Sequence, residues 1–173
     1  RYEMAAKVAG KNGMAILQDM LYFTANQEKE HAIVFYNYLK DVFKDANVSM
    51  EANYPVDLDQ DLSSLLEQAA QHEYDEATSI YKQFGDEAKE EGYVEIATTF
   101  YMICEIEHYH HERFKKYHNL LTSGKLFNDQ STVKWMCMNC GFIYEGTDAL
   151  TICPVCKHPQ GYSLRLDESQ FHL

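Results

Sequence analysis

The sequence predicts a mainly helical chain, in which a four-helix bundle is followed by a small β domain. Three long stretches, at residues 14–44, 61–91 and 93–122, repeat their apolar residues at steps of three and four. Beyond the third stretch the pattern changes to short aromatic-rich segments separated by turns. A segment of about forty residues buries too little apolar surface to fold without a further source of stability. We therefore expect two domains, at residues 1–127 and 128–173.

The first helix of the bundle is represented only by a short segment. Residues 5–8 have the composition of the end of a helix, and Gly10 and Gly13 stop that helix. A helix this short is not stable by itself. We therefore expect that the chain as given begins inside a truncated first helix and that its natural N-terminus lies upstream.

The three long stretches each have one apolar face. The residues expected on these faces are Leu17, Leu21, Thr24, Phe35 and Tyr38 in the first stretch, Leu62, Leu66 and Ala69 in the second, and Ile96, Phe100, Ile103 and Phe114 in the third. Residues 45–61 are expected to form a loop that crosses from one end of the bundle to the other. Gly85 is a weak point inside the second long helix, Gly92 separates it from the third, and Gly124 ends the third.

The C-terminal segment is expected to contain three short strands. Their positions, judged from aromatic and β-branched residues between glycine and proline turns, are 134–136, 142–144 and 162–166. A bound metal is the expected source of the stability that this segment cannot obtain from a core.

The composition excludes several classes of partner. The chain has 173 residues and a net charge of −12 at pH 7, with no basic stripe to neutralise phosphates, so nucleic acid is not an expected ligand. No apolar run approaches the ~20 residues that cross a bilayer. The first residues also lack the apolar core of a signal peptide. A cytoplasmic protein without a membrane span is expected.

Glutamate and histidine recur three residues apart on separate helices. The first long helix carries Glu28 and His31, and the last carries Glu107 and His110. At 3.6 residues per turn, the two side chains of such a pair project from one face of their helix. A single pair of this kind normally lies on a solvated face, so the pattern becomes informative only through its repetition and its phase.

The middle helix adds Glu73 and Glu76, again three residues apart. All six side chains share the apolar stripes of their helices, so they would be buried in one layer. Each buried charge costs several kcal/mol unless it is compensated. Two divalent cations would balance the four glutamates, and oxygen and imidazole ligands suit iron or manganese better than structural zinc. This is the ligand pattern of ferritin-like di-iron bundles.

Four of the five cysteines form two Cys-x-x-Cys pairs, Cys137 with Cys140 and Cys153 with Cys156. An odd number of cysteines without an export signal argues for a metal site rather than disulfides. Two such pairs make a tetrahedral site of four thiolates. Zinc ribbons share this spacing, but Cys-Gly-Phe-x-Tyr, Cys-Pro-x-Cys and the nearby Trp135 favour iron.

The order of these motifs resembles the rubrerythrin family over essentially the whole chain. The matching segments are Arg1-Tyr2, Asn26-Gln27-Glu28-Lys29-Glu30-His31-Ala32, Glu73-x-x-Glu76, Glu90-Glu91-Gly92-Tyr93, Glu107-x-x-His110 and the four-cysteine tail. The resemblance implies a ferritin-like bundle with a di-iron centre, followed by a rubredoxin-like domain. The rubredoxin-like site would hold one iron, for which zinc can substitute.

The resemblance also implies a role for each ligand. Glu28 and Glu107 would bridge the two irons, Glu73 and His110 would bind one iron, and Glu76 and His31 would compete for the other, the glutamate in the oxidised state and the histidine in the reduced state. Tyr2 and Tyr81 match tyrosines that hydrogen-bond the ligands, and with Glu28, Glu76 and His31 they are the candidate catalytic residues. The family's glutamate ligand on the first helix would lie upstream of Arg1, and Glu3 does not have the helical phase to replace it.

Several other polar residues are expected to have no part in the chemistry. Cys104, one turn before Glu107, is interpreted as a small buried apolar residue. Surface roles are expected for the histidines and glutamates that flank the ligands, namely His72, His108, His111, Glu30, Glu105 and Glu112.

Two metal sites with different ligands predict two different tasks. Four fixed thiolates leave no open position on their iron, so that site transfers electrons. The carboxylate pair can deliver two electrons together, which is the number that reduces hydrogen peroxide to two waters. We therefore expect a peroxidase whose electrons pass through the four-cysteine iron. The alternatives are a ferroxidase or iron-handling protein and a zinc-ribbon interaction module.

The resemblance implies partners as well. It implies an NAD(P)H-linked reductase or a rubredoxin as electron donor. It also implies a head-to-tail homodimer, in which the four-cysteine iron of one subunit serves the di-iron site of the other.

Overall fold

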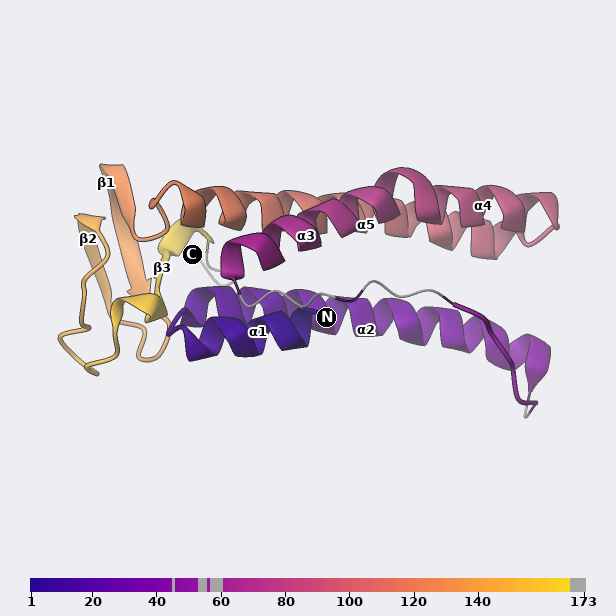
Figure 1. Cartoon of the computed structure of the whole chain (residues 1–173), viewed down its shortest axis with the longest axis horizontal. Coiled ribbons are helices and arrows are strands. Elements are labelled where there is room, and N and C mark those ends of the chain that lie inside the picture. The colour runs from indigo at the N-terminus through magenta and orange to yellow at the C-terminus, as the bar shows by residue number, and fades with distance from the viewer. Residues whose placement is uncertain (45, 53–55, 57–60, 169–173) are drawn as a thin grey trace. The chain divides into compact units, whose positions relative to one another are not determined.

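The computed structural model describes residues 1–44, 46–52, 56 and 61–168, and is drawn in Figure 1. The chain forms two compact units. One unit contains Arg1 and Phe23–Lys116, and the other contains Tyr2–Tyr22 and the residues from Tyr117 onward. The predicted domain division at residues 1–127 and 128–173 follows the motifs along the chain and remains a prediction.

The helices confirm the predicted mainly helical bundle. They are α1 (Tyr2–Lys11), α2 (Ala15–Phe43), α3 (Leu62–Asp75), α4 (Tyr81–Glu90) and α5 (Val94–Thr122). The short first helix is longer than the 5–8 segment from which it was predicted. Part of the predicted loop at 45–61, namely residues 45, 53–55 and 57–60, lies outside the described residues, and this part includes Asn53, Tyr54 and Pro55. No described helix is both long enough and apolar enough to cross a membrane.

The ends of α3 and α4 have clear local causes. The Asp61 carboxylate accepts a hydrogen bond from the Ser64 amide at 2.9 Å, which caps the first turn of α3. At the end of α4, Gly92 has a φ of 90°. This left-handed conformation lets the next amide, that of Tyr93, bond back to the Ala88 carbonyl at 2.8 Å. The glycine therefore ends one helix and allows the chain to enter α5.

The predicted unbroken helix at 61–91 is interrupted by a π-helical turn. Residues Glu76–Ile80 have π-helical hydrogen bonding, and Figure 1 shows the widened turn between α3 and α4. In this region Thr78 and Ser79 donate side-chain hydrogen bonds to the carbonyls four residues earlier, at 2.7 and 2.8 Å. π-helical turns are rare in proteins, and those that occur are often found at functional sites. The interruption begins at Glu76, one of the predicted metal ligands.

Gly85 is a packing position rather than a weak point. It is buried in α4, and a Cβ added there would overlap the ring of Tyr101 on α5. The Tyr101 hydroxyl donates to Asp86 Oδ1 at 2.7 Å. The small residue therefore lets α4 approach α5 closely, and this close contact outweighs the low helix propensity of glycine.

The interior of the first unit contains a polar layer inside an apolar core. Leu66, Ala69, Ala97, Ile103 and Phe114 are among its buried apolar residues. The buried polar and charged residues of this unit are Thr24, His31, Glu73, Glu107 and His110. A ring cluster of Phe35, Tyr81, Phe84 and Phe100 has centroid separations between 5.2 and 6.3 Å. Charged groups inside such a core require a specific compensating partner.

The second unit contains a three-stranded antiparallel sheet with the order β2-β1-β3. The strands are β1 (Asn128–Cys137), β2 (Ile143–Asp148) and β3 (Ser163–Arg165). β1 is longer than the predicted 134–136 strand because its pairing with β2 continues past a register shift to Asn128. Trp135 is fully buried in β1, and its Nε1 donates to the Gly146 carbonyl at 3.0 Å. The predicted strands are confirmed, with different ends.

The α1–α2 turn packs against the four-cysteine segment inside this second unit. A Cβ added at Gly161 would overlap the carbonyl oxygen of Gly13 and lie 3.4 Å from the Met14 Cα. Backbone meets backbone at this point, so no flexible side chain can move away. Gly161 is therefore required by a close approach of two segments.

Candidate metal centres

Three glutamates and one histidine gather at one point inside the first unit. Glu28 on α2, Glu73 on α3, and Glu107 and His110 on α5 offer side-chain atoms that all lie within 4.8 Å of one another. Glu73, Glu107 and His110 are fully buried, and Glu28 is half-buried. The helical phase that the sequence predicts brings these four residues together.

The two histidines lie directly against the glutamates. His110 Nδ1 is 2.8 Å from Glu28 Oε1, 2.8 Å from Glu107 Oε2 and 3.6 Å from Glu73 Oε2. His31 Nδ1 is 3.0 Å from Glu107 Oε1 and 3.2 Å from Glu28 Oε2. The imidazole rings are stacked, with centroids 5.9 Å apart. Glu28 and Glu107 therefore contact both histidines, as expected for carboxylates that reach two metal ions.

The buried atoms of this cluster point toward a shared space rather than toward hydrogen-bond partners. Within the described part of the chain, Glu28 Oε1, both carboxylate oxygens of Glu107 and His110 Nδ1 are buried without a hydrogen bond of acceptable geometry. Buried polar groups in proteins are normally satisfied. Lone pairs that converge without bonding one another fit cations, and a set of oxygen and imidazole donors fits iron.

The electrostatics of the cluster follow from its burial and its charges. Burial alone would lower the pKa of His110, but the contacts with Glu107, Glu28 and Glu73 outweigh it and raise that pKa to about 11. The same balance at His31, with Glu107 and Glu28 as partners, raises its pKa to about 9. The opposite effect holds the pKa of Glu107 below its ordinary value, since contacts with His110 and His31 outweigh burial. Protons on the imidazoles balance the carboxylates, and metal ions compete for the same lone pairs.

Glu76 lies beside this group but is not one of its four members. It begins the π-helical turn and is half-buried. Burial, and then the charges of Glu107 and Glu28, raise the pKa of Glu76 to about 7. His31, in contrast, contacts both of those glutamates directly. The competition between Glu76 and His31 for one ion remains a prediction.

The two predicted tyrosines have different positions. The Tyr81 ring packs on Phe35 and Phe100, with centroids 5.8 and 6.0 Å away. Burial, and then the nearby charge of Glu76, raise the pKa of Tyr81 well above its ordinary value. Tyr2 begins α1 and belongs to the other unit. Hydrogen bonds from these tyrosines to metal ligands remain a prediction.

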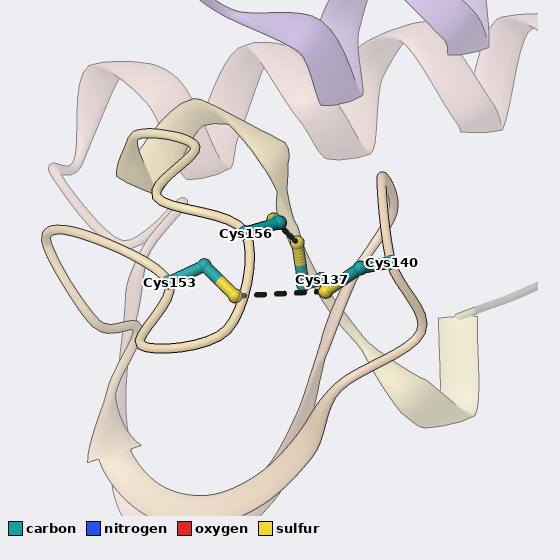
Figure 2. Close-up of side chains that lie close together, drawn as sticks. All are labelled: Cys137, Cys140, Cys153 and Cys156. Atoms are coloured by element: carbon teal, nitrogen blue, oxygen red, sulfur yellow. Dashed lines mark hydrogen bonds between the residues drawn. The ribbon is translucent and has the colours of Figure 1, made fainter.

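The four cysteines form a second group in the other unit. Figure 2 shows their sulfur atoms pointing toward one another from two turns of the chain. Cys137 Sγ is 3.6 Å from Cys156 Sγ, and Cys140 Sγ is 3.6 Å from Cys153 Sγ. All four sulfurs lie within 4.8 Å of one another, without a disulfide. These are the distances and the donor set of a four-thiolate metal site.

Backbone amides surround the sulfurs with a repeated pattern. Each first cysteine accepts from the amides two and three residues later, so Cys137 and Cys153 are equivalent. Each second cysteine, Cys140 or Cys156, accepts from the amide two residues later. These amides lower the pKa of the Cys153 and Cys156 thiols, which favours the thiolate that binds metal. The two turns therefore act as two copies of one ligand-holding motif.

Two polar residues near the carboxylate cluster were not predicted to matter. Gln27 Oε1 is 3.1 Å from His110 Nε2, and Arg113 Nη1 donates to the same oxygen at 2.9 Å. Their spacing is a usable signal, because Gln27 directly precedes Glu28 and Arg113 follows His110 by three residues, on the same helical face.

One prediction about the flanking histidines is corrected. His108 is exposed as expected, but His72 and His111 are half-buried. The Nδ1 of His111 donates to the Ala70 carbonyl at 2.7 Å, and the ring of His111 packs against Tyr74. The carbonyl of a neighbouring helix satisfies the imidazole, so His111 is a packing residue. Cys104 is half-buried, and the flanking glutamates Glu30, Glu105 and Glu112 are exposed as predicted.

Comparison with known families agrees with both centres. A family model described as rubrerythrin matches residues 1–118, and one described as the rubrerythrin rubredoxin-like domain matches residues 135–162. The chain belongs to the rubrerythrin family. Rubrerythrins bind a di-iron centre and a rubredoxin-type iron, and the two ligand groups of this chain correspond to those cofactors.

Individual relatives extend this assignment over most of the chain. Rubrerythrin of Clostridium perfringens is 42% identical over 162 residues, which cover 94% of this chain and 83% of that protein. Rubrerythrin of Nitratidesulfovibrio vulgaris is 34% identical over the same shares. A structure of nigerythrin in a partially reduced state matches with a TM-score of 0.60 and 22% identity, covering 95% of this chain and 76% of that one. The last similarity supports the fold.

Proposed function

We propose that this rubrerythrin-family oxidoreductase is a non-haem di-iron peroxidase that reduces hydrogen peroxide to water. The observation that carries the proposal is the presence, in one chain, of two centres with different donor sets. One has carboxylate and imidazole donors, and the other has four thiolates. A peroxidase that draws on a separate electron source needs both a reaction centre and an electron-transfer centre.

The carboxylate centre is the proposed reaction centre. When bound, a pair of ferrous ions supplies two electrons together, as required by H₂O₂ + 2 H⁺ + 2 e⁻ → 2 H₂O. Glu28 and Glu107 would hold both ions, since each contacts both histidines. Glu73 and His110 would be further ligands of one ion. His31 and Glu76 would be alternative ligands of the other ion, the histidine in the reduced state and the glutamate in the oxidised state.

The residues of this centre also exclude bulk water from the reaction. Glu73, Glu107 and His110 are fully buried, and the aromatic cluster around Tyr81 lies next to Glu76. Charged groups interact more strongly in such a setting than in water. Tyr81 and Tyr2 are the proposed hydrogen-bond partners of the ligands. They would keep the ligand carboxylates in a fixed orientation as the charge on the metal changes.

The four-cysteine centre is the proposed electron relay. Cys137, Cys140, Cys153 and Cys156 would occupy every position of a tetrahedral iron. The amides directed at the sulfurs stabilise the charged thiolates and limit rearrangement during a change of oxidation state. The chain therefore holds this iron for electron transfer rather than for binding a substrate.

The proposed electron source is an NAD(P)H-linked reductase, directly or through a rubredoxin, in the cytoplasm where those nucleotides are present. The proposed assembly is a head-to-tail homodimer. Large apolar side chains exposed on α2 and α5, such as Ile33, Tyr36, Met102 and Tyr109, support an interface between subunits. Sedimentation of the iron-loaded protein as a monomer at micromolar concentration would contradict the dimer.

Stopped-flow mixing tests the reaction. The reduced, iron-loaded protein is mixed in separate experiments with hydrogen peroxide and with O₂, and the absorbance of the oxidised centres is followed. We expect oxidation by peroxide to be at least ten times faster at equal concentration. Faster oxidation by O₂, with accumulation of ferric iron in the protein, would reject the peroxidase and favour a ferroxidase.

A further inference from the structure

We propose that Gln27 and Arg113 are positioning residues that fix the ring of His110 with its Nδ1 facing the metal pair. This inference rests on the proposed role of His110 as a ligand. A neutral imidazole that binds metal through Nδ1 must carry its proton on Nε2. A fixed hydrogen-bond acceptor at Nε2 therefore selects the tautomer that leaves Nδ1 free for metal.

The structure places such an acceptor on α2. Gln27 Oε1 lies 3.1 Å from His110 Nε2, while His110 Nδ1 faces Glu28 and Glu107 on the other side of the ring. His110 is fully buried, so water does not compete for Nε2. The hydrogen bond therefore sets both the rotation of the ring and the position of its proton.

An amide alone would not fix the tautomer, because it can rotate by 180° and present its NH₂ group instead. Arg113 prevents this rotation. Its Nη1 lies 2.9 Å from Gln27 Oε1, and a guanidinium only donates hydrogen bonds, so the atom that it contacts must be the amide oxygen. Because Arg113 holds the amide oxygen in this position, Nε2 of His110 can bond to that oxygen only as a hydrogen-bond donor.

Arg113 is itself held in place. The same Nη1 donates to the hydroxyl of Thr24 at 2.9 Å, and the guanidinium lies over the Phe23 ring at 5.0 Å from its centroid. Thr24 is fully buried. Residues on α2 thus orient Arg113 of α5, Arg113 orients Gln27, and Gln27 orients His110.

His31 provides an internal comparison. Its Nδ1 contacts Glu28 and Glu107, but its Nε2 has no hydrogen-bond partner among the residues that the structure describes. One histidine of the centre is therefore anchored at its outer nitrogen and the other is not. The anchored histidine suits a permanent ligand, and the unanchored one suits a ligand that exchanges.

The choice of a neutral acceptor has a chemical consequence. Metal-bound histidines often donate to a carboxylate, which raises the basicity of the ring. Here the acceptor is an amide whose oxygen is already shared with a cation. His110 is therefore a less basic ligand than it would be beside a carboxylate, and this stabilises the ferrous state relative to the ferric state.

Two substitutions at Gln27 separate positioning from packing. Methionine has nearly the same length as glutamine but no acceptor, whereas glutamate keeps the acceptor and adds a charge. We expect Gln27→Met to weaken Fe²⁺ binding at the carboxylate centre by 10- to 100-fold, the usual effect of removing such a partner. Gln27→Glu should bind Fe²⁺ within about threefold of the wild type and should lower the reduction potential of the pair. Gln83→Met, at an exposed glutamine on α4, is the matched control and should change neither quantity.

Arg113 is tested by the same measurements. Arg113→Met frees the amide to rotate and should weaken Fe²⁺ binding, whereas Arg113→Lys keeps a donor near Gln27 and should restore part of the affinity. The affinity is measured by competition with a chelator in the full-length protein. The four-cysteine iron, identified by its thiolate absorption, serves as an internal reference.

In Zn²⁺-loaded protein, the Nε2 proton of His110 should exchange slowly with water in the wild type and rapidly in Gln27→Met.

The outcomes distinguish this inference from the proposed function. If His110→Ala leaves Fe²⁺ binding at the carboxylate centre unchanged, the ligand assignment itself fails. If His110→Ala removes binding but Gln27→Met binds as tightly as the wild type, only the positioning role fails. A result in which Gln27→Met is tolerated and Gln27→Glu is not would show that Gln27 acts through packing.

Discussion

Lys157 has the same backbone conformation in the second cysteine turn as Gly141 has in the first. Their φ angles are 65° and 75°, and their amides bond to the carbonyls of Cys153 and Cys137 at 3.0 and 2.8 Å. The left-handed conformation costs a residue with a Cβ about 1–2 kcal/mol. The two turns are therefore equivalent in geometry but not in strain.

Replacement of Lys157 by glycine should stabilise the iron-loaded protein. Relief of the left-handed strain is partly offset by the greater freedom of glycine in the unfolded chain, about 0.4–1 kcal/mol, so a net gain of about 0.5 kcal/mol is expected. The free energy of unfolding is measured by chemical denaturation, and the absorption of the four-cysteine iron is the probe. Lys157→Ala is the control, because it also removes the Nζ bond to the Pro154 carbonyl but keeps the Cβ. Equal stability of the two variants would show that the conformation is not strained.

Replacement of Gly161 by alanine should destabilise the second unit. The new Cβ would overlap the Gly13 carbonyl oxygen and would lie only 2.9 Å from the Gly13 carbonyl carbon. Forced displacement of packed backbone costs about 1–3 kcal/mol. Gly146→Ala is the matched control, because its Cβ would make an ordinary 3.6 Å contact with the Asp148 carbonyl oxygen. Thermal unfolding of the two iron-loaded variants measures the effect, and equal midpoints would contradict the close contact.

The metal-free protein should lose stability as the pH rises from about 5 to 7. The pKa of Glu76 is raised from 4.5 to about 7, so in this window the folded protein holds a proton that the unfolded chain has released. Unfolding then becomes easier with increasing pH, by at most about 1.4 kcal/mol per pH unit and by about 2 kcal/mol in total after allowance for partial exposure. The raised pKa values of His31 and His110, about 9 and about 11, add to this loss from about pH 6.5 upward, where the histidines of the unfolded chain release their protons.

Urea denaturation of chelator-treated protein, followed by helical circular dichroism at pH 5 and pH 7, measures this effect. Glu76→Gln cannot ionise and should remove the part of the pH dependence below about pH 6.5, while the part caused by His31 and His110 remains. Glu30→Gln, at an exposed position, should leave the dependence unchanged. A metal-free wild type that is more stable at pH 7 than at pH 5 would show that Glu76 is not buried as described.

The parts of the structure that depend on periodicity could be predicted from the sequence, and the parts that depend on local contacts could not. The phase of Glu28, Glu73, Glu107 and His110 relative to apolar neighbours determines that they converge, because helix geometry is regular. The π-helical turn at Glu76 leaves no trace in that periodicity. It depends on how a single turn packs, as does the strained conformation of Lys157, a residue type that rarely has a positive φ.

The contacts of Gln27 and Arg113 were missed for a related reason. Polar residues beside a predicted ligand are normally expected on a solvated face, and only the crossing of α2 and α5 shows that they meet. His111 was placed at the surface by the same logic, whereas the Ala70 carbonyl of α3 satisfies its ring. Contacts between helices decide these positions.

Loss of one thiolate should separate the two proposed tasks. Cys137→Ser removes a ligand from the four-cysteine site, so electrons should no longer reach the carboxylate centre. The reduced variant should still react once with peroxide at a rate within about threefold of the wild type, while steady-state turnover with a reductase falls by 100-fold or more. Cys104→Ser is the matched control, because Cys104 belongs to neither ligand group. Loss of the single reaction as well would reject the division of labour.

The adjacent histidines of α5 should differ sharply in their effect on metal content. His110 is fully buried among three glutamates, and His111 bonds to the Ala70 carbonyl. His110→Ala should lower the affinity of the carboxylate centre for Fe²⁺ by 100-fold or more, because a ligand is lost and three carboxylates are left without its compensating charge. His111→Ala should keep the irons and lose about 1 kcal/mol of stability, the typical value of one hydrogen bond. Iron analysis per chain and chemical denaturation measure the two effects. Since both substitutions remove the same side chain from neighbouring positions, equal iron loss would show that helix damage, rather than ligation, controls metal binding.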